Sequence, residues 1–151
     1  MSIQSIIKTV TVKAAPAKAF EIFTLKMGEW WKVGTTMSGK PHVAITIEPK
    51  VEGRWYERDA AGAETQWGKV LAWEPPKRLL LAFQINSKMK FDPGLITELE
   101  LNFEASGHGE TNVRLEHRNL ERYGADAEKF VAMMTQGWAQ KLNEFATLAN
   151  V

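Results

Sequence analysis

Cysteine is missing from this sequence, and neither sign of charge is in clear excess. Without cysteine the chain has no disulfide bond, no thiolate zinc site and no cysteine nucleophile. The 19 basic and 18 acidic residues give a formal net charge of +1. A chain so close to neutrality has no extended field to attract nucleic acid or an anionic membrane, so we expect no nucleic-acid partner.

The chain also lacks a long hydrophobic run. No stretch approaches the ~20 apolar residues that a bilayer-spanning helix needs. The first five residues do not show the basic and then apolar pattern of a signal peptide. We therefore expect no membrane insertion and a cytoplasmic location. Because 151 residues, 44% of them hydrophobic, suffice for one core, we assign residues 1–151 to a single domain.

The sequence motifs of several catalytic and metal-binding classes are absent as well. No His-Glu-x-x-His or clustered carboxylate pattern is present, so we expect no metal. Neither a Gly-x-Ser-x-Gly elbow nor a phosphate loop is present, and we expect no cofactor. His42 stands at the start of a strand and His108 in a glycine turn, so both side chains are predicted to be solvated.

The chain does contain a regular succession of strand and helix patterns. Alternating or β-branched segments predict strands near 6–13, 43–48, 53–58, 64–73, 79–85, 95–104 and 113–118. Two short helices are predicted, one after Pro16 and one at 28–32. The order of one strand, two short helices, six strands and a long helix is typical of the α+β class. We expect a curved antiparallel sheet wrapped around the C-terminal helix.

Residues 126–148 predict that long helix. Its apolar side chains step by three or four positions and form one stripe, made of Val131, Met134, Trp138, Leu142, Phe145 and Ala149. Phe130, Met133 and Gly137 flank the stripe, and both Met133 and Met134 are expected in the core. The residues assigned to polar cover are Lys129, Gln140, Lys141 and Glu144. The sheet is the apolar surface large enough to cover this stripe.

A cavity between the sheet and the helix is the predicted binding site. Side chains on the apolar sides of their strands or of the helix should line it, and Trp31 should lie at its mouth. The predicted ligand-binding residues are Trp31, Phe83, Leu101, Phe103, Leu115, His117, Met134 and Trp138. Aromatic walls and adaptable methionine side chains are common in such cavities.

His117 and Glu57 are the titratable candidates for this cavity. His117 shares the strand parity of Leu115 and Val113, so its ring should point inward. It would be satisfied by a neighbouring hydroxyl or carbonyl group, or else act as a polar anchor or general acid/base. Glu57 faces inward if Trp55 does, but a solvated edge strand is the favoured interpretation because glutamate is rarely buried.

Five segments in order resemble the START-related helix-grip superfamily, also called SRPBCC. They lie at 12–20, 51–62, 68–79, 109–117 and 137–145, and the most specific reads GKVLAWEPPKRL at 68–79. The chain looks like the branch named after the C-terminal domain of the activator of the heat-shock chaperone ATPase. The resemblance implies a helix-grip fold over nearly the whole chain. It implies no fixed catalytic set, because this scaffold hosts several functions.

Three functions follow as hypotheses. The first is binding of a small hydrophobic or aromatic molecule in the cavity. The second is an enzyme of cyclase or hydrolase type in the same cavity, with His117 and Glu57 as proton carriers. The third is a chaperone-regulating module in the stress response, for which the resemblance implies a homodimer or a chaperone as partner. We favour binding over catalysis, because no second convincing titratable residue accompanies His117.

Overall fold

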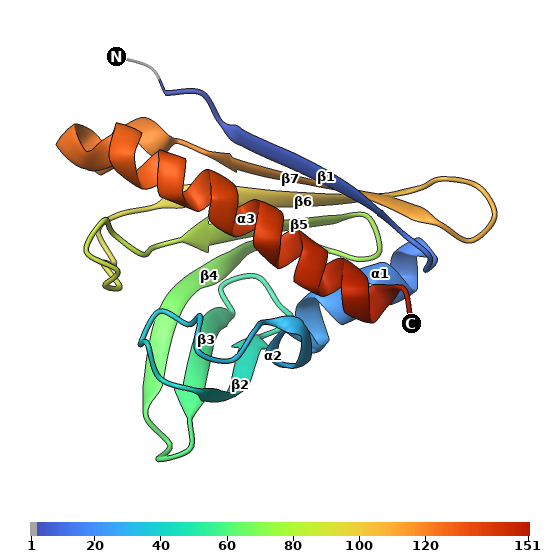
Figure 1. Ribbon diagram of the computed structural model, residues 1–151, viewed down its shortest axis with the longest axis horizontal. Helices are drawn as coiled ribbons and strands as arrows, with labels where there is room; N and C mark the ends of the chain where they lie inside the picture. Colours follow the sequence, from blue (N-terminus) through green and yellow to red (C-terminus); the bar gives the residue numbers. More distant parts are fainter. Residues whose placement is uncertain (1–2) are drawn as a thin grey trace.

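The computed structural model describes residues 3–151 (Figure 1). Residues 1 and 2, part of the N-terminal stretch examined for a signal peptide, lie outside the described residues. One antiparallel sheet has the strand order β1-β7-β6-β5-β4-β3-β2. Its strands are β1 (Ile6–Val12), β2 (His42–Ile47), β3 (Arg54–Asp59), β4 (Glu64–Glu74), β5 (Arg78–Phe83), β6 (Thr97–Ala105) and β7 (Thr111–Arg118).

The helices occur where the sequence predicts them, with one addition. They are α1 (Pro16–Leu25), α2 (Met27–Trp30), the 3-10 helix η1 (Leu120–Asp126) and α3 (Ala127–Ala149). The helix η1 was not predicted. It begins after Asn119 at φ +66° and is interrupted at Gly124, whose φ of +68° is a left-handed value that favours glycine. The predicted α+β class and the order of the main elements are confirmed.

The sheet curls around α3 (Figure 1). Helix α3 runs across it, with β1, β7, β6 and β5 behind the helix and β4, β3 and β2 turning away below it. The buried stripe contains Met134, Trp138, Leu142, Phe145 and Ala149, as predicted, while Val131 is only partly buried. Within residues 3–151, no helix has the length and hydropathy needed to cross a membrane.

Two side chains of α3 depart from the helical pattern. Lys141, expected to be polar cover, is only 8% exposed, and Met133, expected in the core, is 52% exposed. The aliphatic stem of a lysine can be buried when its ammonium group finds partners, and Lys141 has such partners across the fold. Met133 is left uncovered because it lies at the rim of a cavity, which is described below.

Strand β3 also corrects an expectation, since Trp55 and Glu57 are both buried. Glu57 is 1% exposed, although a solvated edge position was expected. The strand lies inside the sheet between β2 and β4, so its inward face has no access to water. Opposite Trp55 stands Gly68, where an added Cβ would lie 1.7 Å from the carbonyl oxygen of Ala82. Only glycine fits this approach of β4 to β5.

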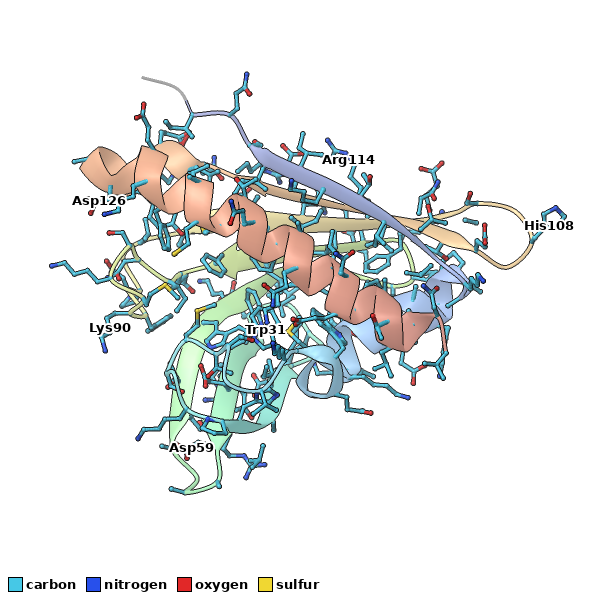
Figure 2. The ribbon with its side chains drawn as sticks, viewed as in Figure 1. Trp31, Asp59, Lys90, His108, Arg114 and Asp126 are labelled. Carbon is cyan, nitrogen blue, oxygen red and sulfur yellow. The ribbon has the colours of Figure 1, made fainter. Side chains whose placement is uncertain are left out.

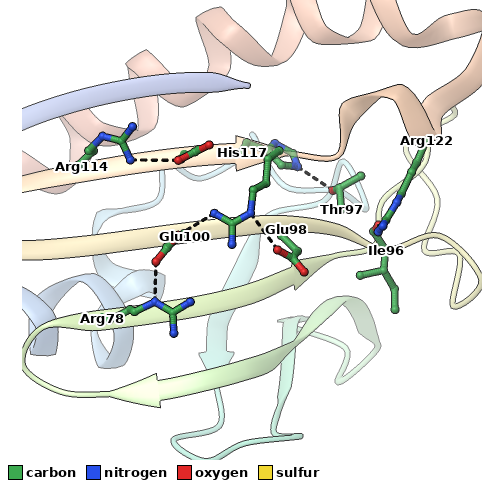
Figure 3. A network of polar contacts seen from close by, with 10 residues as sticks. Arg78, Ile96, Thr97, Glu98, Glu100, Arg114, His117 and Arg122 are labelled. Carbon is green, nitrogen blue, oxygen red and sulfur yellow. Dashed lines mark hydrogen bonds and ion pairs between the residues drawn. The ribbon is translucent and has the colours of Figure 1, made fainter. Parts of the chain in front are cut away.

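The outward face of the sheet carries a charged network (Figure 3). Arg118 donates to Glu98 at 2.9 Å and to Glu100 at 2.7 Å, and Arg78 donates to Glu100 at 2.5 Å. Partial burial would raise the pKa of Glu100, but the hydrogen bonds from the two arginines lower it to about 2. The network links β5, β6 and β7 on the side away from α3, so the apolar side chains of these strands are left to face the helix.

Candidate functional site

A cavity of about 340 Å³ opens beside α3, along the stretch from Phe130 to Lys141. Its walls come from α3, from Phe83 at the end of β5, from the α2–β2 loop (31–41) and from the β5–β6 loop (84–96). Twelve residues line it, namely Trp31, Thr35, Met37, Phe83, Met89, Phe130, Met133, Met134, Gly137, Trp138, Gln140 and Lys141. We call this space the α3 cavity. Its volume lies at the small end of the range of ligand sites.

Methionine is concentrated in this lining. Four of the six methionines of the chain line the cavity, and they come from α3 and from both loops. Met89 and Met133 are 38% and 52% exposed, so they form the rim, whereas Met134 is buried. Unbranched, polarizable side chains can adapt to guests of different shape and make favourable contacts with aromatic rings.

Aromatic rings form the inner wall. Trp31 lies beneath the middle of α3, where the curled part of the sheet meets the helix (Figure 2). Its ring centroid is 4.8 Å from that of Trp67 and 6.3 Å from that of Trp138. Phe83 continues the wall, with its ring 5.8 Å from that of Trp138. Trp31, Phe83 and Trp138 thus form an apolar wall, and the buried Trp67 packs against Trp31 outside the lining.

One end of the α3 cavity is charged. The Lys141 ammonium donates to the Thr35 hydroxyl and, at 3.0 Å, to Glu144, and it lies 4.4 Å from the centroid of the Trp31 ring. Burial lowers the pKa of Lys141, and the neighbouring Glu144 carboxylate works in the opposite direction. Burial would also raise the pKa of Glu144, but hydrogen bonds from Lys141 and Gln140 lower it. The two groups form an ion pair at this end of the cavity.

His117 lies behind the inner wall, fully buried on β7. Its Nδ1 accepts a hydrogen bond from the Trp138 indole at 3.0 Å, because an indole nitrogen can only donate. Its Nε2 then carries the proton and donates to the Thr97 hydroxyl at 2.7 Å (Figure 3), which donates to the carbonyl of Phe83 at 2.9 Å. The ring is held as one neutral tautomer with both nitrogens occupied.

The electrostatics of His117 agree with this geometry. Burial lowers the pKa of its imidazole from 6.5 to about 3. A ring that is neutral at physiological pH and has both nitrogens bonded is poorly placed to exchange a proton with a guest. Its contact with Phe83, at 4.9 Å between ring centroids, and its bond to Trp138 instead fix two side chains of the cavity wall.

The structure brings together half of the predicted ligand-binding residues. Trp31, Phe83, Met134 and Trp138 line the α3 cavity. The other four, Leu101, Phe103, Leu115 and His117, are buried in the core and are not among the lining residues of the described chain. Phe103 lies near α1 instead, with its ring 5.1 Å from that of Phe20. Strand parity predicts which side chains face inward. It does not predict which of these inward side chains line the cavity and which are packed in the core.

Sequence reasoning missed the loop and rim residues of the site. Met37 and Met89 lie in segments without periodicity, and Lys141 was assigned to polar cover. The enrichment of methionine outside regular strands was a signal that could have identified Met37 and Met89. No local pattern identifies Lys141, because its partner Thr35 is 106 positions away in the chain.

The α2–β2 loop is attached to the sheet by a second buried polar cluster. The Glu57 carboxylate accepts hydrogen bonds from the Ser38 amide at 3.0 Å, the Ser38 hydroxyl at 2.8 Å and the Trp67 indole at 2.8 Å. His42, expected in solvent, is buried, and its Nε2 lies 2.9 Å from the carbonyl oxygen of Gly28. Its burial follows from the packing of α2 on β2. Glu57 thus holds the loop that carries Thr35 and Met37.

Comparison with known proteins identifies the family. The family model of activator of Hsp90 ATPase homolog 1-like proteins matches residues 13–150. The chain belongs to this family. The match confirms the resemblance predicted from the five sequence segments. A search of curated proteins gave no significant match.

Solved structures with this fold include two with higher sequence identity. An anthrahydroquino-gamma-pyrone synthase, Txn09, is 32% identical, with 97% of each chain covered and a TM-score of 0.67. The self-sacrificing resistance protein CalC from Micromonospora echinospora is 29% identical, with 96% of this chain and 93% of that chain covered and a TM-score of 0.69. The Aha1 dimer from Colwellia psychrerythraea, at 18% identity, covers 99% of this chain and 98% of its own with a TM-score of 0.69, and shows likeness of fold alone.

Proposed function

We propose that this protein binds a small hydrophobic, aromatic molecule in the α3 cavity. The observation that carries this proposal is the lining, in which four methionines and four aromatic residues make up eight of the twelve side chains. A predominantly apolar cavity with a few polar groups at one end is the usual form of a small-molecule site. We further expect the protein to act in the cytoplasm.

The relatives of higher identity support a small-molecule role over a chaperone-regulating one. Txn09 is named as a synthase of a fused pyrone, and it is more similar in sequence to this chain than the Aha1 dimer is. The likeness to the Aha1 dimer is a likeness of fold, so it does not indicate a partner for this chain. A homodimer or a chaperone partner therefore stays a prediction of the family resemblance.

The proposal is tested by filling the cavity. N-phenyl-1-naphthylamine, a neutral apolar dye that fluoresces when removed from water, serves as the probe. Met134→Trp should fill the space beside Phe83 and weaken probe binding by about tenfold or more. Asn143→Trp places the same indole at an exposed position of α3 and is the matched control, which should bind as the wild type does.

Two results would contradict the proposal. One is a wild-type protein that does not raise the fluorescence of the dye at any concentration tested. The other is a Met134→Trp variant that folds and binds as tightly as the Asn143→Trp control.

Catalysis in the same cavity is the second candidate, favoured by the 32% identity to a synthase. His117 does not suit the role of proton carrier, for the reasons given above. Lys141 is the titratable side chain in the cavity wall. If the protein is an enzyme, Lys141→Gln should abolish turnover of an aromatic polyketide-type substrate, while His117→Gln, which can keep both hydrogen bonds, should leave partial activity.

A further inference from the structure

We infer that the α3 cavity selects aromatic molecules bearing an ionised acidic oxygen, a carboxylate or a phenolate, and that Lys141 binds this oxygen at the Trp31 end. The inference rests on the proposed function, which it makes more specific. It assigns to Lys141 the anchoring role that the sequence suggested for His117.

The first argument is the position of the ammonium group. Lys141 is the one charged side chain among the twelve lining residues that the structure describes. Thr35 and Trp31, two of the three groups that contact its ammonium, line the cavity as well. An ammonium has three N–H donors, and the hydrogen bonds to Thr35 and Glu144 use two of them. The third has no hydrogen-bond acceptor among the described residues, and a guest lying against Trp31 would be placed to accept from it.

The second argument is the balance of charge around that donor. Glu144 faces Lys141, but its two oxygens already accept from Lys141, from Gln140 at 3.0 Å and from the Lys32 amide at 3.1 Å. The side chain of Lys32 is close enough for its charge to lower the pKa of Lys141. Lys32 is exposed and lies outside the lining, so the positive charge in the cavity wall is that of Lys141, which Glu144 shares with two other donors. A guest carrying a negative charge would be attracted there, and a cationic guest would be repelled.

The third argument is desolvation. The Lys141 side chain is buried, and the ring of Trp31 covers one side of its ammonium. A cation that has lost much of its water gains more from an anionic partner than one in bulk solvent. The aromatic part of the same guest would lie against Trp31, Trp138 and the methionines. One molecule can satisfy both ends of the cavity only if it combines a flat apolar body with an acidic oxygen.

The experiment compares two probes of nearly the same size and shape, one anionic and one neutral. 2-Naphthoate carries a carboxylate, and 2-naphthamide is its neutral counterpart with the same ring system. Isothermal titration calorimetry at pH 7.5 should show that the wild type binds naphthoate at least about tenfold more tightly than naphthamide. Lys141→Gln should remove this preference, because it should weaken naphthoate binding much more than naphthamide binding. Lys50→Gln, which removes one exposed lysine from the β2–β3 turn, is the matched control and should keep the preference.

A second variant keeps the test decisive if Lys141→Gln does not fold. Glu144→Gln removes the anion that competes with the guest for Lys141, so it should strengthen naphthoate binding several-fold and leave naphthamide unchanged. Equal binding of both probes by the wild type, or a preference that survives in Lys141→Gln, would overturn the inference while the proposed function stands. If the wild type binds neither probe and does not bind the dye, the proposed function and the inference fail together.

Discussion

The two halves of α3 use the same apolar stripe for different purposes. In the C-terminal half, Phe145 is fully buried, and its ring packs 5.3 Å from that of Phe23 and 5.8 Å from that of Trp30. In the N-terminal half, Met134 and Trp138 face the α3 cavity, and Met133 lies at its rim. The helix itself does not explain the difference, since the spacing of apolar residues is the same in both halves.

The elements opposite the helix make the difference. The C-terminal half of α3 meets the aromatic residues of α1 and α2, and their rings fill the space. The N-terminal half meets the two loops at 31–41 and 84–96, which bring methionines and polar groups in place of a packed helix face. A site can therefore arise at one end of a continuous core without any break in the helical pattern. The following predictions test whether the two halves differ in this way.

The largest expected effect is in the packed half. Phe145→Ala should lower the free energy of unfolding by about 3–5 kcal/mol, because it removes a fully buried ring and leaves a void. Chemical denaturation followed by circular dichroism measures this loss. The folded fraction of the variant should still bind the naphthylamine dye as the wild type does. A loss of dye binding by folded Phe145→Ala would show that the two halves are not separate.

A smaller effect is expected at the boundary between the halves, where His117 supports Trp138. The folded pKa of about 3 lies below the unfolded value of 6.5, so between these values only the unfolded chain binds the proton. Stability is therefore complete above about pH 6.5 and falls as the pH drops toward 3. By pH 5 this one group should cost about 2 kcal/mol of the free energy of unfolding.

Comparison with His117→Gln isolates that contribution from other titrating groups. Glutamine can accept from Trp138 and donate to Thr97, but it does not titrate. The variant should be less stable than the wild type at pH 7.5, yet lose about 2 kcal/mol less between pH 7.5 and pH 5. Urea denaturation at the two pH values measures both changes. Equal losses in the two proteins would mean that His117 is accessible to protons in the folded state.

Local sequence patterns predict most of the fold because they depend on near neighbours. Alternation in β6 and the stripe of α3 follow from residues two to four positions apart, and both elements form as expected. The helix η1 was missed because it depends on the left-handed backbone at Asn119, which no periodicity indicates. Alternation did not decide which face of β3 is inward, and a solvated Glu57 was favoured because glutamate is rarely buried. The side-chain partners that allow its burial, Ser38 and Trp67, lie outside its own strand.

The site was predicted less completely, because much of it depends on contacts between residues that are far apart in the chain. Parity and helical spacing identified Phe83, Met134 and Trp138, which belong to regular elements. The polar end of the cavity depends on the pairing of Lys141 with Thr35, and that pairing exists only once loop and helix have met. The prediction that His117 faces inward is correct. Its ring does not reach the cavity, because Phe83 and Trp138 lie between the two.

The smallest expected change in stability is at the rim of the cavity. Met133→Ala should alter the free energy of unfolding by no more than about 0.5 kcal/mol, because the Met133 side chain is half exposed and fills no core space. The same substitution removes part of the cavity wall, so dye affinity should fall several-fold. The substitution at Met133 would then lower dye affinity and leave the stability of the fold nearly unchanged. The reverse is expected for Phe145→Ala. Thermal melting and dye titration of Met133→Ala measure both effects. The exposed Gln136→Ala change on the same helix, outside the cavity lining, is the control. If Met133→Ala destabilised the fold and left dye binding intact, the Met133 side chain would belong to the core and not to the rim of the cavity.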